Sequence, residues 1–305
     1  MLALSCSHKP KEKQLGKEDF PLIQKYNAGA GDVFYFRPRD GQFVLVERRK
    51  ALAIAIAPEP TIEAFSFDDR ITVSRKMPEG EALENKTFLE NVGAQQALAI
   101  TQNGHTLAGG DAHGVVNLWS LADGSLELQS NRQSAVQRLA FSPNGDFLAI
   151  GLGQPASDPL DTLWIYDLHS KGPLHSFGRN SIHALAWSID NHWYAAGLDD
   201  GSILVGEVDS SIAPRRIAVS GSPVVALNFH PSGLFLASAH ADKRIVISKV
   251  PMGEPVFTFE PPLPPNPLFP NAIEQVTFDG TGARMAVSYA EGDMRIWDTS
   301  ALSTP

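Results

Sequence analysis

The stretch Val136-Gln-Arg-Leu-Ala-Phe-Ser-Pro-Asn-Gly-Asp-Phe-Leu-Ala-Ile-Gly151 decides how this chain folds. Its first part, 136–141, is a mostly apolar run of strand length, and a second apolar run follows at 147–150. Between them stands Ser-Pro-Asn-Gly, in which Pro presets φ and Gly accepts a positive φ. The stretch therefore predicts a tight β-hairpin, and this hairpin recurs along the chain.

The recurrence is aligned on the last large apolar residue of the first strand, which we call the anchor. The anchors are Ile100, Phe141, Trp187, Phe229 and Phe278, at steps of 41, 46, 42 and 49 residues. Four residues after each anchor comes a residue type that tolerates a left-handed backbone, as a tight hairpin turn requires. These residues are Gly104, Gly145, Asn191, Gly233 and Gly282. Eight residues after each anchor comes an alanine: Ala108, Ala149, Ala195, Ala237 and Ala286.

A third strand is predicted after each hairpin, and the last of these strands ends in Trp297-Asp298. The predicted third strands are Val115–Ser120, Leu163–Asp167, Ile203–Glu207, Arg244–Lys249 and Met294–Asp298. With these residues the chain resembles the WD40-repeat family, which has a period of about 40–45 residues and a Trp-Asp signature. The likeness covers 95–300 and is carried by period and hairpin pattern. Only one of the five repeats ends in Trp-Asp, and the Gly-His dipeptide that the family places near the outer strand of each blade is absent from that place.

The resemblance implies an all-β fold, a WD40-like β-propeller with seven blades, or with six as the alternative. The recurrent alanine suggests a crowded contact, such as the narrowing centre of a propeller. A further hairpin is predicted at 33–46 and a third strand at 70–76. The runs 51–57 and 61–67 between them are either an inserted hairpin in a six-bladed ring or the remains of a seventh blade. In this family an N-terminal strand commonly completes the last blade, so residues 20–26 are predicted to close the ring.

Composition narrows the class of protein. The chain has 305 residues, of which 43% are hydrophobic, and a formal net charge of −9. A nucleic-acid-binding groove would give a basic domain, so no nucleic-acid partner is expected. No apolar run is long enough to span a bilayer, so no transmembrane segment is predicted. The nine histidines are scattered, and no phosphate loop, serine-hydrolase elbow or metal motif is found, so no cofactor or metal site is predicted.

The N-terminal segment leaves two alternatives open. Residues 1–6 resemble the end of a bacterial lipoprotein signal, which makes Cys6 a lipidation candidate, although the charged start of such a signal is missing. Residues 1–19 are therefore predicted to be a tail or linker, either disordered or a tether. We assign residues 20–300 to one propeller domain and 301–305 to a C-terminal tail. A cytoplasmic location is slightly favoured, with a bacterial cell-envelope lipoprotein as the alternative.

Aspartates recur just before the third strands. In the WD40 family an Asp at this place fixes the turn through its own backbone, and the resemblance implies that role for Asp111, Asp199 (or Asp200), Asp242 and Asp293. An acidic rim that meets a basic partner is the alternative interpretation of these residues.

The leading functional hypothesis is a non-catalytic, monomeric scaffold that binds protein partners through loops at the rim. From topology, the predicted partner-contact residues are His113, Asp200, Lys243, Arg244 and Glu291. The alternative is a propeller enzyme with an axial site, such as a lactonase, another hydrolase or a quinone-dependent dehydrogenase. That alternative needs polar groups at the inner strands, whereas the sequence places Leu, Ala, Phe and Trp there.

Overall fold

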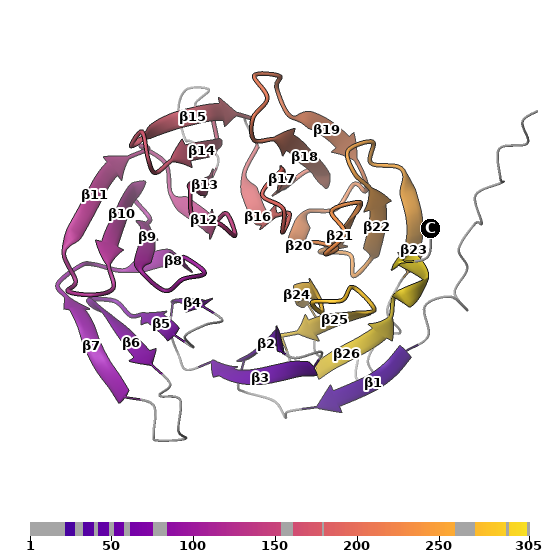
Figure 1. Cartoon of the computed structure of the whole chain (residues 1–305), viewed down its shortest axis with the longest axis horizontal. Helices are drawn as coiled ribbons and strands as arrows, with labels where there is room; N and C mark the ends of the chain where they lie inside the picture. The colour runs from indigo at the N-terminus through magenta and orange to yellow at the C-terminus, as the bar shows by residue number, and fades with distance from the viewer. Residues whose placement is uncertain are drawn as a thin grey trace, which may run out of the picture.

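The strands of this chain form a ring of sheets around a central axis, as the computed structural model in Figure 1 shows. The structure describes residues 22–27, 33–39, 42–48, 52–57, 62–75, 84–153, 161–178, 180–259, 272–290 and 293–303. In these ranges the chain forms strands β1 to β26 and one short 3-10 helix, η2 (Ser300–Ser303). The predicted all-β class is confirmed.

Five sheets take four consecutive strands each, all antiparallel, with the first strand nearest the axis (Figure 1). The first contains β4 (Ala53–Ala57), β5 (Ile62–Ser66), β6 (Arg70–Arg75) and β7 (Glu84–Glu90). The second contains β8 (Gln95–Ile100), β9 (Thr106–Asp111), β10 (Val115–Ser120) and β11 (Leu126–Asn131). The third contains β12 (Val136–Phe141), β13 (Phe147–Leu152), β14 (Leu163–Asp167) and β15 (Gly172–Phe177). The fourth contains β16 (Ile182–Trp187), β17 (Trp193–Leu198), β18 (Ser202–Glu207) and β19 (Arg215–Ala218). The fifth contains β20 (Val224–Phe229), β21 (Phe235–His240), β22 (Ile245–Lys249) and β23 (Pro255–Phe259).

The sixth sheet joins the two ends of the chain. It contains β24 (Ile273–Phe278), β25 (Arg284–Tyr289) and β26 (Asp293–Asp298), and its outer strand is β1 (Leu22–Asn27). β1 runs antiparallel to β26, with Leu22 opposite Trp297 and Tyr26 opposite Met294. This is the outer position that the sequence predicted for residues 20–26. Just beyond β26, Leu302 is 5% exposed and packs into the adjacent core.

The short sheet consists of two strands, β2 (Val33–Arg39) and β3 (Gln42–Arg48). β2 contacts β24 and β25, and Figure 1 shows the pair between the sixth sheet and the sheet that begins with β4. The described strands thus form seven sheets, the number that the sequence favoured. The interpretation of 51–67 was wrong, because β4 and β5 belong to a complete four-stranded sheet and the incomplete sheet is β2–β3.

The repeated hairpin has the predicted turn. Gly145 has a φ of 79°, and its N–H donates to the carbonyl of Ser142 at 2.9 Å. The hydroxyl of Ser142 accepts from the N–H of Phe147 at 2.9 Å, which begins the second strand. All five residues predicted to be left-handed have a positive φ, between 61° and 79°. The local chemistry of the turn therefore sets the register of each hairpin.

The core lies between neighbouring sheets. Each of the five recurrent alanines is at most 2% exposed. Ala149 clusters with Ile182 and Tyr194 of the next sheet, and Ala195 clusters with Val224 of the sheet after that. The crowded contact that the alanines predicted is therefore the interface between sheets, not the centre of the ring.

The sheets approach most closely ten residues after an anchor, where three second strands carry glycine. A Cβ on Gly110, Gly151 or Gly197 would lie only 2.3–2.5 Å from a side-chain carbon of the next sheet's first core residue. For Gly151 that neighbour is Ile182. These glycines let adjacent sheets pack backbone against side chain.

Each four-stranded sheet ends in an outer strand that pairs on one side only. Closure of the ring therefore leaves sheet edges on the perimeter.

Candidate partner-binding faces

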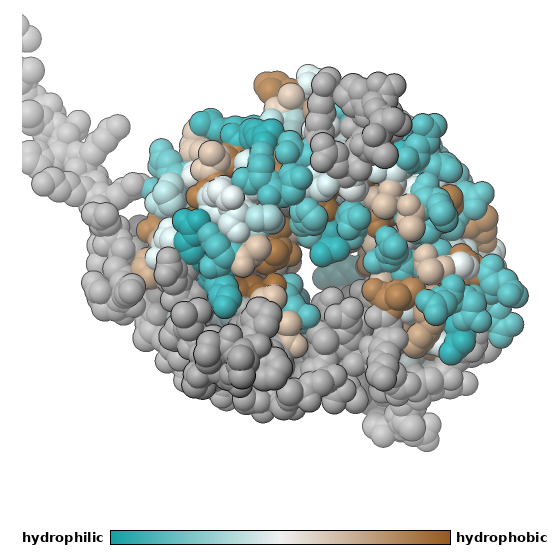
Figure 2. All heavy atoms as spheres, turned by 180° about the vertical axis from the view of Figure 1, so that it is seen from behind, coloured by the Kyte–Doolittle hydropathy of each residue, from teal (hydrophilic) through white to brown (hydrophobic). Residues whose placement is uncertain are grey.

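The turns of the ring lie on two opposite faces. Face A carries the turns that follow the first and third strands of each sheet, such as 142–146 and 168–171. Face B carries the turns that follow the second strands, such as 111–114, and the connections between sheets. Figure 2, which views the ring from behind, shows polar and apolar side chains interspersed around a hollowed centre. The predicted contact residues that the structure describes all lie on face B.

Asp111 holds the turn that carries His113. Its Oδ1 accepts from the N–H of His113 at 2.9 Å and from the N–H of Val115 at 2.8 Å. The imidazole of His113 is exposed beyond this turn. The carboxylate thus serves its own backbone, and the histidine faces solvent.

At the equivalent turn of the β16–β19 sheet, Asp200 rather than Asp199 accepts from the backbone of the turn. Oδ1 of Asp200 accepts from the N–H of Ser202 at 3.0 Å, and its Oδ2 pairs with Arg216. Burial raises the pKa of Asp200, but the bonds from Ser202 and Arg216 outweigh it and the net pKa is lowered. Asp199 instead accepts from the side-chain amide of Asn180 at 3.0 Å. The carboxylate of Asp200 is therefore already bonded to two residues of its own sheet, Ser202 and Arg216.

Lys243 and Arg244 differ in how their charges are held. Arg244 donates from its backbone N–H to Oδ1 of Asp242 at 3.2 Å and from Nε to Oδ2 at 2.7 Å. Burial raises the pKa of Asp242, and the bonds from Arg244 more than reverse that effect. Lys243 stands at the tip of this turn with a φ of 73°. The charge of Arg244 is therefore engaged within the turn.

The predicted residues do not form one cluster. His113, Asp200 and Lys243 lie on turns of three different sheets. Glu291, the side chain of Asp293 and Cys6 fall outside the described residues.

The inner strands carry polar side chains that the sequence analysis overlooked. Arg138 on β12 is exposed and donates to the carbonyl of Gln137 at 2.7 Å. His183 occupies the equivalent region of β16, and burial together with Arg138 lowers its pKa, while Asp199 acts in the opposite direction. The statement that the inner strands are apolar is therefore wrong at their face B ends.

His240 is another residue whose place the sequence did not reveal. It ends β21 and is fully buried. Its Nδ1 lies 3.1 Å from the carbonyl of Ser222, and its Nε2 lies 3.0 Å from the hydroxyl of Ser238. Burial lowers the pKa of His240, so the ring is neutral at pH 7. The histidine ties the second strand to the connection between sheets.

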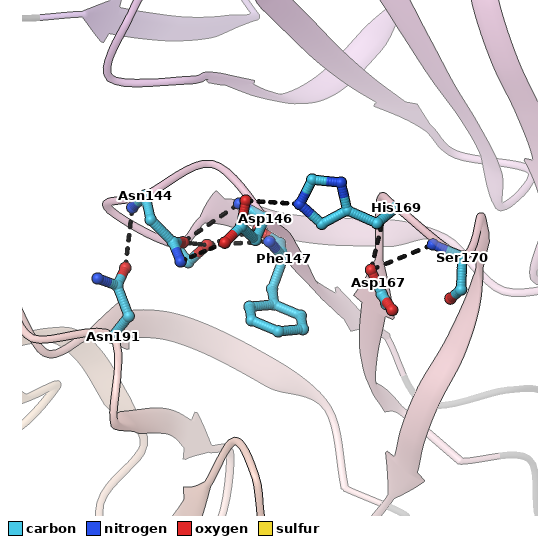
Figure 3. A network of polar contacts seen from close by, with 8 residues as sticks. Asn144, Asp146, Phe147, Asp167, His169, Ser170 and Asn191 are labelled. Atoms are coloured by element: carbon cyan, nitrogen blue, oxygen red, sulfur yellow. Dashed lines mark hydrogen bonds and ion pairs between the residues drawn. The ribbon is translucent and has the colours of Figure 1, made fainter.

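Face A is held by a polar network that joins three turns (Figure 3). The N–H of Asn144 donates to Oδ1 of Asn191 in the next sheet at 2.8 Å. The side-chain amide of Asn144 donates to Asp146 at 2.6 Å, and Asp146 lies 2.8 Å from Nε2 of His169. These contacts fix turns of adjacent sheets relative to one another.

Exposed aliphatic side chains gather on the same face. Ile189 is 61% exposed, Ile212 76%, Leu234 61% and Met252 54%. All four belong to turns of two adjacent sheets, β16–β19 and β20–β23. Single exposed apolar residues are ordinary, whereas a group on one face marks an interaction surface. We call these four residues the apolar patch.

The sequence held a signal for part of the patch. Two residues after its anchor, the repeat of Trp187 has Ile189. The other repeats have Gln102, Pro143, Pro231 and Gly280 at this position. Five residues after its anchor, the repeat of Phe229 has Leu234. The other repeats have His105, Asp146, His192 and Ala283 at this position. A large aliphatic residue in a turn is the feature that could have identified the surface.

The part of the chain that the structure describes contains neither a cluster of metal-ligating side chains nor a helix that could span a membrane. No three His, Cys, Asp or Glu side chains come together there as metal ligands would. No helix within the same ranges has the length and apolar character needed to cross a membrane.

Comparison with known families agrees with the ring geometry. Residues 171–205 and 216–247 match the family described as WD domain, G-beta repeat. These two stretches are WD40 repeats. The first matched stretch begins directly before the outer strand β15, and the second begins within the outer strand β19. Each ends in the third strand of the next sheet, β18 and β22 respectively. The sequence repeat is thus offset from the sheet, and the offset links consecutive blades.

Of the following three similar proteins, two are by name components of larger assemblies. Protein HIR1 of Chaetomium globosum is 31% identical over 202 residues, which cover 55% of this chain and 17% of that protein. Small ribosomal subunit protein RACK1y of Oryza sativa is 28% identical, over 49% of this chain and 44% of that protein. Target of rapamycin complex subunit wat1 of Schizosaccharomyces pombe is 28% identical, over 54% and 49%. This chain spans less than half of the length of each of them.

Proposed function

We propose that this WD40 propeller is a non-catalytic scaffold that binds protein partners. The observation that carries the proposal is the apolar patch, because it places four exposed aliphatic side chains on turns of two adjacent blades. Backbone hydrogen bonds already hold these turns, so they lose less conformational entropy on binding than a loop without such bonds. The names of two similar proteins, a ribosomal subunit protein and a complex subunit, agree with such a role.

The proposal is tested by purification of the full chain from its native cells after mild cross-linking. A scaffold is expected to yield a protein adduct in stoichiometric amount, identified by mass spectrometry. A chain that is recovered without any adduct, under conditions in which a known complex from the same cells is captured, contradicts the proposal.

The face B candidates call for a revised substitution. Exchange of both Lys243 and Arg244 for Glu removes the ion pair of Arg244 with Asp242, so a loss of binding would be mixed with a loss of stability. Lys243→Glu alone keeps that pair. If face B contributes to binding, this variant weakens recovery of the adduct without a lower melting temperature.

An axial enzyme is the second candidate, favoured by the polar side chains of Arg138, His183 and Asp199 at the inner ends of two blades. Metal analysis and an absorption spectrum of the purified chain distinguish it from a scaffold. Stoichiometric calcium or a quinone absorption band would replace the scaffold proposal with an enzyme.

The location of the scaffold is proposed to be the cytoplasm, in agreement with similar proteins from eukaryotes. The alternative is a lipid tether at Cys6. The intact mass of the native chain decides between them, since acylation at Cys6 adds the mass of the acyl groups and removes the residues before it.

A further inference from the structure

The segments that carry the apolar patch lie next to one another across two blades, and the inference drawn from them rests on the scaffold function proposed above. Four contacts connect the segments that carry the patch. A Cβ on Gly233, beside Leu234, would lie 3.3 Å from Oδ2 of Asp190, which follows Ile189. The N–H of Val250 donates to the carbonyl of Leu234 at 2.9 Å, which brings the turn of Met252 alongside.

Two further contacts connect the outer side of the same surface. Nη1 of Arg215 lies 3.4 Å from Sδ of Met252, so the loop that carries Ile212 reaches the next blade. The N–H of Val208 donates to the carbonyl of His192 at 3.0 Å, which returns to the turn of Ile189. The apolar patch therefore surrounds the seam between two blades.

Face A around this patch is strongly acidic. The described residues of this face lie in two sets of segments. The turns after first strands are 101–105, 142–146, 188–192, 230–234 and 279–283, and the segments at the ends of third strands are 120–125, 167–171, 207–214, 249–254 and 298–299. These segments contain nine carboxylates and two lysines. Arg215 and Arg284 stand directly beside them, at the face A ends of β19 and β25, so carboxylates outnumber cations nine to four. The carboxylates are Asp123, Asp146, Asp167, Asp190, Glu207, Asp209, Glu254, Asp279 and Asp298, and the lysines are Lys171 and Lys249.

Several of these carboxylates are firmly ionised at neutral pH. Hydrogen bonds from Ser125, Ser170 and Ser300 lower the pKa values of Asp123, Asp167 and Asp298. Asp209 and Glu254, which flank the patch, are exposed. A positively charged partner is therefore steered toward this face.

We propose that the apolar patch binds a peptide segment of a protein partner in which large apolar side chains alternate or cluster with Lys and Arg. The apolar side chains of the segment contact Ile189, Leu234 and Met252, and its basic residues meet the surrounding carboxylates. A second copy of this chain fits less well, because a two-fold interface would oppose the same acidic face to itself. An anionic membrane surface is repelled for the same reason.

The test uses the purified full chain and a phage-displayed library of random dodecapeptides, selected at 150 mM NaCl. Enriched peptides are expected to carry at least two large apolar residues together with Lys or Arg. Their affinity is measured by fluorescence anisotropy with the synthetic peptide. The Ile189→Ser/Leu234→Ser variant is expected to lose at least tenfold in affinity, as removal of interface anchors does.

Matched variants separate this surface from the rest of the ring. Leu126→Ser changes an exposed leucine of another blade, 53% exposed, and is expected to change the affinity less than twofold. Asp209→Lys/Glu254→Lys is expected to weaken binding at least threefold, and an increase to 500 mM NaCl is expected to weaken it as well, because salt screens exposed charges. If the double serine variant fails to fold, Ile212→Ser replaces it, since that side chain is 76% exposed.

Several outcomes would overturn the proposal. Enrichment of acidic peptides, or binding that the patch substitutions leave unchanged, would place the peptide site elsewhere. A dimer in sedimentation that Leu234→Ser abolishes would identify a second copy as the occupant. Binding that tightens tenfold when residues 1–19 are deleted would identify the chain's own N-terminal segment. Failure of peptide selection while native cross-linking still yields a protein adduct rejects this inference and leaves the scaffold function in place.

Discussion

The contact between Gly151 and Ile182 makes the strongest stability prediction. A Cβ at Gly151 would lie 2.5 Å from Cγ2 and 2.8 Å from Cβ of Ile182. Ordinary carbon contacts are about 3.5–4.0 Å, so the overlap is roughly 1 Å. These atoms are close to the backbone of a β-branched residue and cannot rotate away. We expect Gly151→Ala to lower the free energy of unfolding by about 1–3 kcal/mol through overpacking.

A double-mutant cycle isolates this contact. Ile182→Ala alone is expected to cost about 2–5 kcal/mol, because it leaves a cavity between two blades. In the Gly151→Ala/Ile182→Ala variant the new methyl occupies space that Cγ2 has left, so the double variant is expected to be at least as stable as Ile182→Ala. Urea unfolding followed by circular dichroism measures all four proteins. The control is Gly221→Ala, where a Cβ would have no heavy atom within 4 Å. Additivity of the two substitutions within about 0.5 kcal/mol would refute the close-packing argument.

Three further predictions concern turns and buried histidines. Asn191→Ala is expected to lower the free energy of unfolding by about 1–2 kcal/mol, because Asn191 has a φ of 61° and its Oδ1 accepts from the N–H of Asn144. Asn191→Gly should regain, in the same urea assay, the share of this loss that comes from the left-handed backbone. Asp111→Ala is expected to cost about 1 kcal/mol, since two backbone N–H groups lose their acceptor, and a melting temperature equal to that of the wild type would contradict this role. Burial lowers the pKa of His230 and His240 below the ordinary value of 6.5, so the unfolded chain binds more protons and stability is expected to fall as the pH drops below about 6.5. His240→Gln should make the decline of the melting temperature between pH 7.5 and 5.5 shallower, although Asp242 and Arg244 also face this histidine, and an unchanged slope would assign the effect to other groups.

Local turn chemistry made most of the fold predictable. Ser142, Gly145 and Asn191 act within a few residues of themselves, so the sequence alone located the turns and their left-handed residues. The anchors then placed the inner strands of five sheets, because every repeat keeps the same spacing between strand and turn.

Long-range pairing was harder to predict. Residues 51–57 and 61–67 have strand-like patterns that fit either an inserted hairpin or the remains of a seventh blade. What distinguishes them is the pairing of β5 with β6, with Ala64 opposite Val73, and a sequence pattern does not reveal it. The incomplete sheet was therefore assigned to the wrong segment.

Side-chain roles that depend on single positions were also missed. Asp199 and Asp200 are neighbours, and only the geometry of the turn shows that Asp200 accepts from Ser202. In the sequence His240 is one of nine scattered histidines, and only the packing of adjacent blades shows that it is buried. The apolar patch combines segments of two blades, so its continuity appears only in three dimensions.

The most direct test of the central claim compares the two faces of the ring inside native cells. A photoreactive p-benzoylphenylalanine replaces Leu234 on face A in one version of the chain and His113 on face B in another, with Leu126 as a position outside the apolar patch. After irradiation, the claim that face A binds the partner predicts a protein adduct from position 234 and a much weaker one from positions 113 and 126. Adducts that form from position 113 alone, or from none of the three positions, would contradict it.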